Sequence, residues 1–268
     1  MDRLIVLGTG NATVTRCYNT CFAVSGGEGT LLCDAGGGNG ILAQIERARL
    51  PWEDIHHMIV THAHCDHLLG VVWVLRIVGT RMLAGTYHGS LHLYCDSSVA
   101  EGLRQIAALT LQKKVCDLID CRILLHSIEN GQSERLAGYD VTFFDIRSTK
   151  LKQFGFVLSL PMGKRLCCLG DEPYNPACAA YVQNADWLLC EAFCLYADRE
   201  RFKPYEKHHS TVKDACELAE SLGVPKLVLW HTEDARLSER KRLYTMEGRA
   251  YYSGELHVPD DLEVIPLS

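Results

Sequence analysis

Four side chains of the kinds that bind metals fall within six positions, in the stretch THAHCDHLLG at residues 61–70. They are His62, His64, Asp66 and His67, and they directly follow the apolar run MIV. Imidazole and carboxylate groups cost free energy to desolvate, so their concentration at the end of a hydrophobic run indicates that they bind something. Together they suit zinc, and also iron or manganese. Four ligands from so short a segment do not all fit around one ion, so the spacing favours two ions that share ligands from distant parts of the chain.

Further polar residues stand at the ends of other apolar runs. Asp34 follows TLLC, Asp171 follows RLCCLG, Glu191 ends WLLCE and His231 follows KLVLW. In layered folds of strands and helices, ligand sites collect at the carboxyl ends of strands. We therefore expect these residues to approach the histidine cluster, with Asp171 as the natural candidate for a carboxylate that bridges two ions.

The elements that must position these residues follow from periodicity and turn residues. Apolar runs predict strands at 4–10, 55–61, 139–146, 154–160, 165–171, 186–193 and 226–232, and 21–38 predicts a hairpin around SGGEG. Helical spacing predicts helices over 41–50, 67–78 and 210–223, the last with Ser210 as N-cap. The two halves have similar layouts with no Pro/Ser-rich linker between them. This pattern predicts an α/β (α+β) protein with one domain over residues 1–268, in which two mixed sheets pack together under outer helices.

The composition of the 268 residues narrows the function further. The formal net charge of −6 gives no global positive field for nucleic acid, and no apolar run reaches the ~20 residues of a membrane helix. The start MDRLIVLGTG lacks the features of a secretory leader, so we expect a cytoplasmic protein. Its 13 cysteines contain no CxxC pair and are expected to be reduced thiols used as small apolar side chains.

Several motifs, taken together, resemble one known family. They are LGTGNA (7–12), LLCDAGGG (31–38), THAHCDHLLG (61–70), LGDE (169–172), LLCEAF (188–193), HHST (208–211), LVLWHTED (227–234) and VPDDLEVIPL (258–267). The chain resembles the metallo-β-lactamase superfamily, and within it the ribonuclease Z-like branch, over nearly its whole length. The resemblance implies an αββα sandwich, in agreement with the strands expected above.

The resemblance also implies a role for each residue of the site. His62 and His64 would bind the first ion, Asp171 would bridge, and the second ion would be bound by Asp66, His67 and His231. The expected cofactor is Zn²⁺, as one or two ions, with Mn²⁺ or Fe²⁺ as alternatives. A hydroxide held between the ions would be the nucleophile. The catalytic residues would be Asp66, Glu191 and His209, of which the last two match the pair that assists the leaving group.

One segment departs from the family pattern. The family supplies a third histidine to the first ion, but the matching segment 143–156 holds Arg147 at the expected position. A guanidinium stays protonated and has no lone pair for a cation. Two hypotheses follow: a weakened first site in which one ion dominates, or a site in which Arg147 binds a phosphate or carboxylate of the substrate.

A second departure concerns the substrate. Ribonuclease Z proper carries a long Gly/Pro-rich arm with basic residues that grips tRNA, whereas residues 155–171 pass between strands through a tight PMGK turn. We therefore expect a metal-dependent hydrolase, a phosphodiesterase acting on a small or nucleotide-like substrate, with tRNA disfavoured. The alternatives are an armless ribonuclease Z that matures tRNA 3′ ends, and a metal-binding protein whose catalysis is impaired by Arg147. The number of subunits is left open, with a homodimer as one alternative.

Overall fold

The computed structural model describes residues 2–267 as two seven-stranded sheets packed face to face. Sheet I has the order β14 (Val264–Pro266), β1 (Arg3–Gly8), β2 (Cys21–Gly26), β3 (Gly29–Cys33), β4 (Ile55–Val60), β5 (Leu91–Cys95), β6 (Ile123–Ser127). Sheet II has the order β13 (Glu255–His257), β12 (Lys226–Trp230), β11 (Trp187–Glu191), β10 (Arg165–Cys168), β9 (Phe154–Ser159), β8 (Tyr139–Asp145), β7 (Ser133–Leu136). The first half of the chain builds sheet I together with the C-terminal β14, and the second half builds sheet II.

Each sheet is antiparallel at one end and parallel at the other. In sheet I the neighbours from β14 to β3 are antiparallel and those from β3 to β6 are parallel. In sheet II the neighbours from β7 to β10 are antiparallel and those from β10 to β13 are parallel. The carboxyl ends of β3 and β4 therefore share one edge of sheet I, and those of β10, β11 and β12 share one edge of sheet II.

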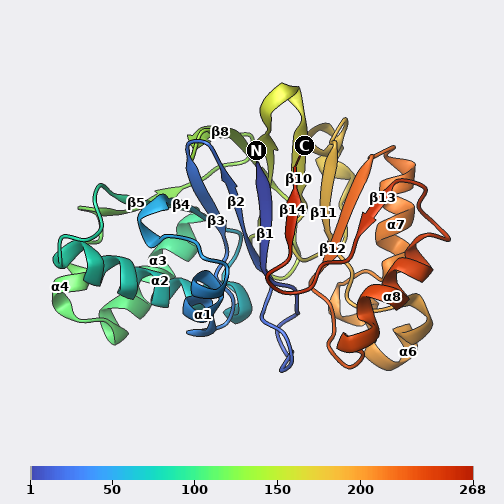
Figure 1. The fold of residues 1–268 in the computed structure, drawn as a ribbon, viewed down its shortest axis with the longest axis horizontal. Helices are drawn as coiled ribbons and strands as arrows, with labels where there is room; N and C mark the ends of the chain where they lie inside the picture. Colours follow the sequence, from blue (N-terminus) through green and yellow to red (C-terminus); the bar gives the residue numbers. More distant parts are fainter. Residues whose placement is uncertain (1, 268) are drawn as a thin grey trace.

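Helices cover the outer face of each sheet, as Figure 1 shows. Against sheet I lie α1 (Gly40–Arg47), α2 (Cys65–Leu83), α3 (Ser97–Thr110) and α4 (Lys113–Cys116). On the side of sheet II lie α5 (Ala179–Val182), α6 (Arg199–Phe202), α7 (Val212–Ser221) and α8 (Leu237–Gly248). The predicted αββα sandwich is therefore confirmed.

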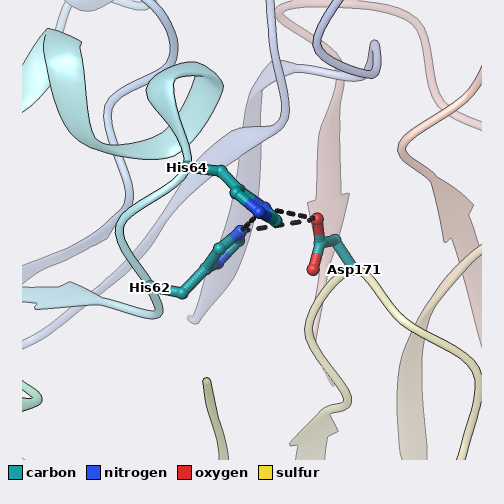
Figure 2. Close-up of side chains that lie close together, drawn as sticks. All are labelled: His62, His64 and Asp171. Carbon is teal, nitrogen blue, oxygen red and sulfur yellow. Dashed lines mark hydrogen bonds and ion pairs between the residues drawn. The ribbon is translucent and has the colours of Figure 1, made fainter. Parts of the chain in front are cut away.

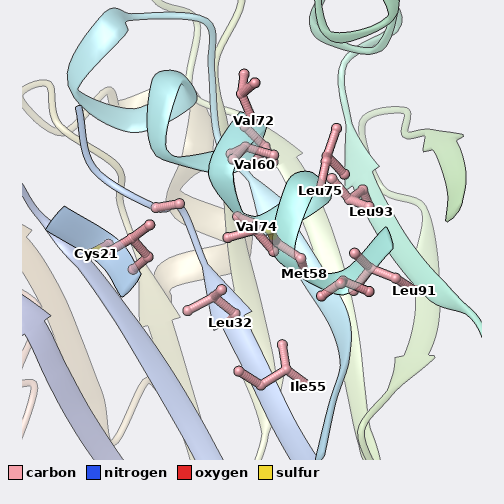
Figure 3. Packing of buried hydrophobic residues seen from close by; sticks show 14 of the residues in the cluster. Cys21, Leu32, Ile55, Met58, Val60, Val72, Val74, Leu75, Leu91 and Leu93 are labelled. Atoms are coloured by element: carbon pink, nitrogen blue, oxygen red, sulfur yellow. The ribbon is translucent and has the colours of Figure 1, made fainter. Parts of the chain in front are cut away.

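Strand alternation explains how the layers are held together. In β1, Leu4 and Val6 belong to the core between the sheets, whereas Ile5 and Leu7 belong to the core under the helices, because successive side chains of a strand point to opposite faces. Figure 3 shows the core under α2, where helix residues such as Leu75 pack on the strands of sheet I. Burial on both faces fixes the strands, and with them the loops at their carboxyl ends.

Two expectations about local structure need correction. The helix expected over 67–78 begins two residues earlier, at Cys65, so Asp66 also lies on its first turn. The N-cap of α7 is Thr211 rather than Ser210, and its side chain forms a capping box with Asp214.

Two further sequence expectations can be compared with the structure. The thirteen cysteines are all free. Among residues 2–267, no helix has the length and apolar character needed to cross a membrane.

Candidate metal centre

The first ligand group joins the two sheets at their shared edge. His62 and His64 follow β4 of sheet I, and Asp171 follows β10 of sheet II. Figure 2 shows both imidazoles directed at the carboxylate. The distances to Asp171 Oδ2 are 3.5 Å from His62 Nε2 and 4.0 Å from His64 Nδ1. Three potential ligand atoms from two segments, one after each sheet's strand, therefore face one small volume.

The second ligand group lies on the other side of the same carboxylate. Asp66 Oδ2 lies 3.4 Å from His67 Nε2 and 3.5 Å from His231 Nε2. Both of these nitrogens are also 3.7 Å from Asp171 Oδ2. A single oxygen of Asp171 thus faces four imidazoles, two from each group, as a bridging carboxylate would.

Backbone conformation at the strand ends turns these side chains inward. His64 occupies the N-cap position of α2 with extended dihedral angles, and the helix then places Asp66 and His67 on its first turn. Gly170 and His231 both have positive φ, 83° and 55°. The left-handed conformation is readily accepted by glycine and uncommon for histidine. At His231 it marks local strain of the kind that clusters at functional sites.

Asp34, at the end of β3, orients the histidines from behind. Its Oδ2 accepts hydrogen bonds from His67 Nδ1 at 2.8 Å and from the Thr61 hydroxyl at 2.7 Å, and its Oδ1 accepts from Thr61 N at 2.8 Å. The Thr61 oxygen in turn lies 2.9 Å from His62 Nδ1. Because Asp34 is an acceptor only, it holds the proton of His67 on Nδ1 and leaves Nε2 free as a ligand. The sequence pattern placed Asp34 at the correct edge but gave it no role.

Burial and charge act in opposite directions on the ionisable groups here. Burial favours raised pKa values for Asp66 and Asp171, but contacts with neighbouring histidines hold both pKa values below the ordinary range, so both carboxylates are charged. Burial lowers the pKa of His62 despite the nearby carboxylate of Asp171. Burial also disfavours charge on His67, but the carboxylates of Asp34 and Asp66 outweigh it and raise the pKa of that histidine.

The hydrogen-bond inventory of the buried atoms fits a divalent cation. His67 Nε2 and both ring nitrogens of His231 are buried and accept or donate no hydrogen bond. Buried polar atoms without partners are rare in folded proteins, because each costs desolvation energy. A cation between the ligand groups would satisfy the two Nε2 atoms that face Asp66 and Asp171. Imidazole and carboxylate donors in this number are typical of zinc and of other transition-metal sites.

Glu191 and His209 form a carboxylate–imidazole pair beside the second ligand group. Glu191 is fully buried at the end of β11, and its Oε2 lies 3.6 Å from His209 Nδ1. Its Oε1 accepts a hydrogen bond from Ser210 N, which fixes the carboxylate. The His209 ring stacks on Phe193 with centroids 5.0 Å apart and lies 5.2 Å from the ring of His231. The structure thus brings together the pair that the sequence singled out.

A cavity of about 310 Å³ opens beside both ligand groups. Asp66, Asp171, His209 and His231 contribute to its walls, as does the exposed Cys65. Phe193, Asn11 and two cations, Lys150 and Lys207, line the rest together with small neighbours. No local signal in the sequence distinguished these two lysines from the other basic residues near them.

Arg147 lies outside this arrangement. Its side chain is 59% exposed, its NH1 is 3.7 Å from Asp145 Oδ2, and its backbone N–H is bonded to the same carboxylate. The residue of this segment that reaches the ligand groups is Gln153, whose Nε2 is 2.8 Å from His62 Nδ1 and bonded to Asp171 Oδ1. No local signal in the sequence separates Gln153 from its polar neighbours.

Comparisons with known proteins agree with this geometry. Residues 30–232 match the family model described as "Beta-lactamase superfamily domain". The ribonuclease Z of Gemmatimonas aurantiaca is 26% identical over an alignment of 308 positions that covers 98% of this chain and 94% of the relative.

Two solved structures share the fold over almost the entire chain. The metallo-β-lactamase fold protein YhfI from Bacillus subtilis superposes with a TM-score of 0.79 at 18% identity, covering 98% of each chain. A diphosphatase from the PhnP family superposes with a TM-score of 0.75 at 17% identity, covering 100% of this chain and 98% of the other. The family match, the shared fold and the paired ligand groups all agree. This chain belongs to the metallo-β-lactamase superfamily of metal-dependent hydrolases, in its ribonuclease Z-like branch.

Proposed function

We propose that this protein is a phosphodiesterase that hydrolyses a small or nucleotide-like substrate with two divalent ions, Zn²⁺ in the first instance. The observation that carries the proposal is the position of Asp171 Oδ2, within 3.5–4.0 Å of four imidazole nitrogens at the floor of a cavity. Divalent ions at this position would lower the pKa of a water molecule toward neutrality and stabilise negative charge on a phosphate.

The protein's own residues would position the substrate and move a proton. His209 lines the cavity, and the Glu191 carboxylate lies 3.6 Å from its Nδ1, so the imidazole is held in one orientation. That pairing suits a general acid that protonates the leaving oxygen. Asp66 would orient the attacking water from the second ligand group.

The cavity walls support an anionic substrate of modest size. Lys150 Nζ lies 3.6 Å from Glu172, and Lys207 Nζ lies 5.1 Å over the Phe193 ring, so both ammonium groups are held near the opening. A volume of about 310 Å³ is at the lower end of the range for small-molecule sites. We assign the anion-binding role to Lys150 and Lys207 rather than to Arg147, whose side chain does not line the cavity.

Ribonuclease Z activity is the second candidate, because the curated relative above carries that name. The alignment with that relative spans 308 positions whereas this chain has 268 residues, so the relative contains segments with no counterpart here. Together with the net charge of −6, this supports the smaller substrate, since tRNA binding depends on many phosphate contacts.

Two assays distinguish the candidates. We expect hydrolysis of bis(p-nitrophenyl) phosphate by protein loaded with Zn²⁺ or Mn²⁺, with loss of turnover in the Asp171→Asn variant. Cleavage of a tRNA precursor at its 3′ end, with salt-sensitive binding, would instead favour the ribonuclease. A fully metal-loaded protein inactive in both assays would contradict the proposal and favour the metal-binding protein without catalysis.

A further inference from the structure

Gln153 is a buried polar side chain that contacts both a histidine and the shared aspartate of the first ligand group. It precedes β9, is 1% exposed, and is anchored because the next residue donates its backbone N–H to Thr61 O at 3.1 Å. Its amide nitrogen contacts both His62 Nδ1 and Asp171 Oδ1, and its carbonyl oxygen is buried without a partner.

The neighbour on the other side fixes the orientation of this amide. A 180° rotation would bring the carbonyl oxygen of Gln153 against Asp171 Oδ1, and two acceptors would then face each other. With the nitrogen toward Asp171, one of its protons is bonded to the carboxylate and the other is directed to His62 Nδ1. In this orientation Gln153 is a donor to His62.

Two neighbours of His62 Nδ1 therefore favour opposite tautomers. Thr61 Oγ1 gives its own proton to Asp34, so it accepts from a protonated Nδ1 and leaves Nε2 free for a cation. Gln153 donates to Nδ1 and thereby favours the proton on Nε2, the atom that faces Asp171 and His64. No such competition acts on His67, because its Nδ1 contacts the acceptor Asp34.

The two ligand groups also differ in composition and exposure. Asp66, His67 and His231 are all buried and bring a carboxylate of their own in addition to the shared Asp171. The first group has two histidines and the shared carboxylate, and the side chain of His64 is 33% exposed. Fewer ligands, less negative charge and a histidine with a competing tautomer all weaken the same group.

We propose that Gln153 makes the centre unequal, with one ion bound tightly by Asp66, His67, His231 and Asp171, and a second ion bound weakly and exchangeably by His62, His64 and Asp171. The proposal rests on the two-ion centre proposed above. Removal of the amide donor should strengthen the weak site, since orienting partners of metal ligands change metal affinity by about 10–100-fold.

The test is a metal-binding measurement that does not depend on catalysis. Apo protein is titrated with Zn²⁺ against a chromophoric chelator, and with Co²⁺ followed by its absorption spectrum. The wild type should bind the first equivalent at least about tenfold more tightly than the second. Gln153→Met, which keeps the length and removes the donor, should narrow this difference. Gln153→His, which adds an imidazole, is the second variant, and thermal unfolding of both checks that they fold.

The matched control is Gln183→His, which adds a histidine at an exposed position after α5, and its two affinities should equal those of the wild type. A narrower difference between the two affinities in Gln153→Met supports the proposal, because this variant removes the donor without adding a ligand. Two equal affinities in the wild type, or an unchanged difference in folded Gln153→Met, overturns it. Because the titration does not measure hydrolysis, its result remains a test of the unequal metal sites even if the protein proves not to be a phosphodiesterase.

Discussion

The substitution Asp34→Asn tests whether hydrogen bonds behind the ligands prepare them for a cation. Asp34 has φ of 54°, and asparagine tolerates this left-handed conformation, so the backbone should be preserved. The variant keeps one acceptor oxygen and replaces the other with an NH₂ donor. The Asp34 carboxylate accepts all of its hydrogen bonds from Thr61 and His67, and in the variant one of the two side-chain atoms donates instead.

Two orientations of the new amide have different consequences. With NH₂ at the Oδ1 position, it opposes Thr61 N and leaves a buried donor without a partner, which costs about 1–3 kcal/mol. With NH₂ at the Oδ2 position, it donates to His67 Nδ1 and to Thr61 Oγ1, and the threonine proton can turn to His62 Nδ1. The new amide and the Thr61 backbone N–H are then satisfied, but both histidines carry their proton on Nε2 and cannot bind a cation through that atom.

The apo variant should therefore fold with nearly wild-type stability and bind metal poorly. To bind a cation, the new amide must turn so that its NH₂ group opposes Thr61 N and a buried donor loses its partner. The cost of about 1–3 kcal/mol is subtracted from the free energy of metal binding. At 1.4 kcal/mol for each factor of ten, this weakens affinity by about 5–150-fold. Zn²⁺ competition titrations measure the affinity, and thermal unfolding of the apo protein measures the stability.

The control is Asp96→Asn, the same chemical change at the N-cap of α3, where the side chain accepts from Ser98 N. It should leave the metal affinity unchanged. Wild-type metal affinity in a folded Asp34→Asn protein would refute the argument that Asp34 sets the histidine tautomers.

Three other predictions address catalysis, substrate binding and pH. His209→Gln should lower kcat for bis(p-nitrophenyl) phosphate by about 10²–10⁴-fold with unchanged metal content, and loss of metal in this variant would contradict a proton-transfer role. Lys150→Gln and Lys207→Gln should each raise KM by about tenfold with little change in kcat, whereas equal KM values would place the anion elsewhere. Burial and the neighbouring His92 lower the pKa of His57 to about 4, so folding favours its neutral form. The unfolded chain then binds more protons, and stability is present above pH 6.5 and is lost as pH falls toward 4. His57→Gln should reduce this acid sensitivity in denaturation curves measured between pH 7 and 4.

The local pattern of the sequence determined which elements form and which residue types stand at their ends. Continuous apolar runs in β1 and the neighbouring strands require burial on both faces, and this predicts stacked sheets under helices. The cluster at residues 62–67 indicated a cation because burying so many polar side chains in six positions costs desolvation free energy unless they bind something. The relative placement of Asp171 and His231 was predicted from strand ends alone, and the structure brings both to that cluster.

Only the tertiary structure decided which polar neighbours touch the ligands. Gln153 rather than Arg147 lies beside His62, and Asp34 supports two histidines from a strand that precedes them by more than 25 residues. Lys150 and Lys207 reach the cavity while other lysines and arginines nearby in the sequence do not line it. These contacts depend on how the two sheets meet at one edge. The periodicity of a single strand carries no information about its distance from residues of the other sheet. Hydrogen-bond direction and proton position follow from such contacts, so the inequality of the two ligand groups could be inferred only from the folded protein.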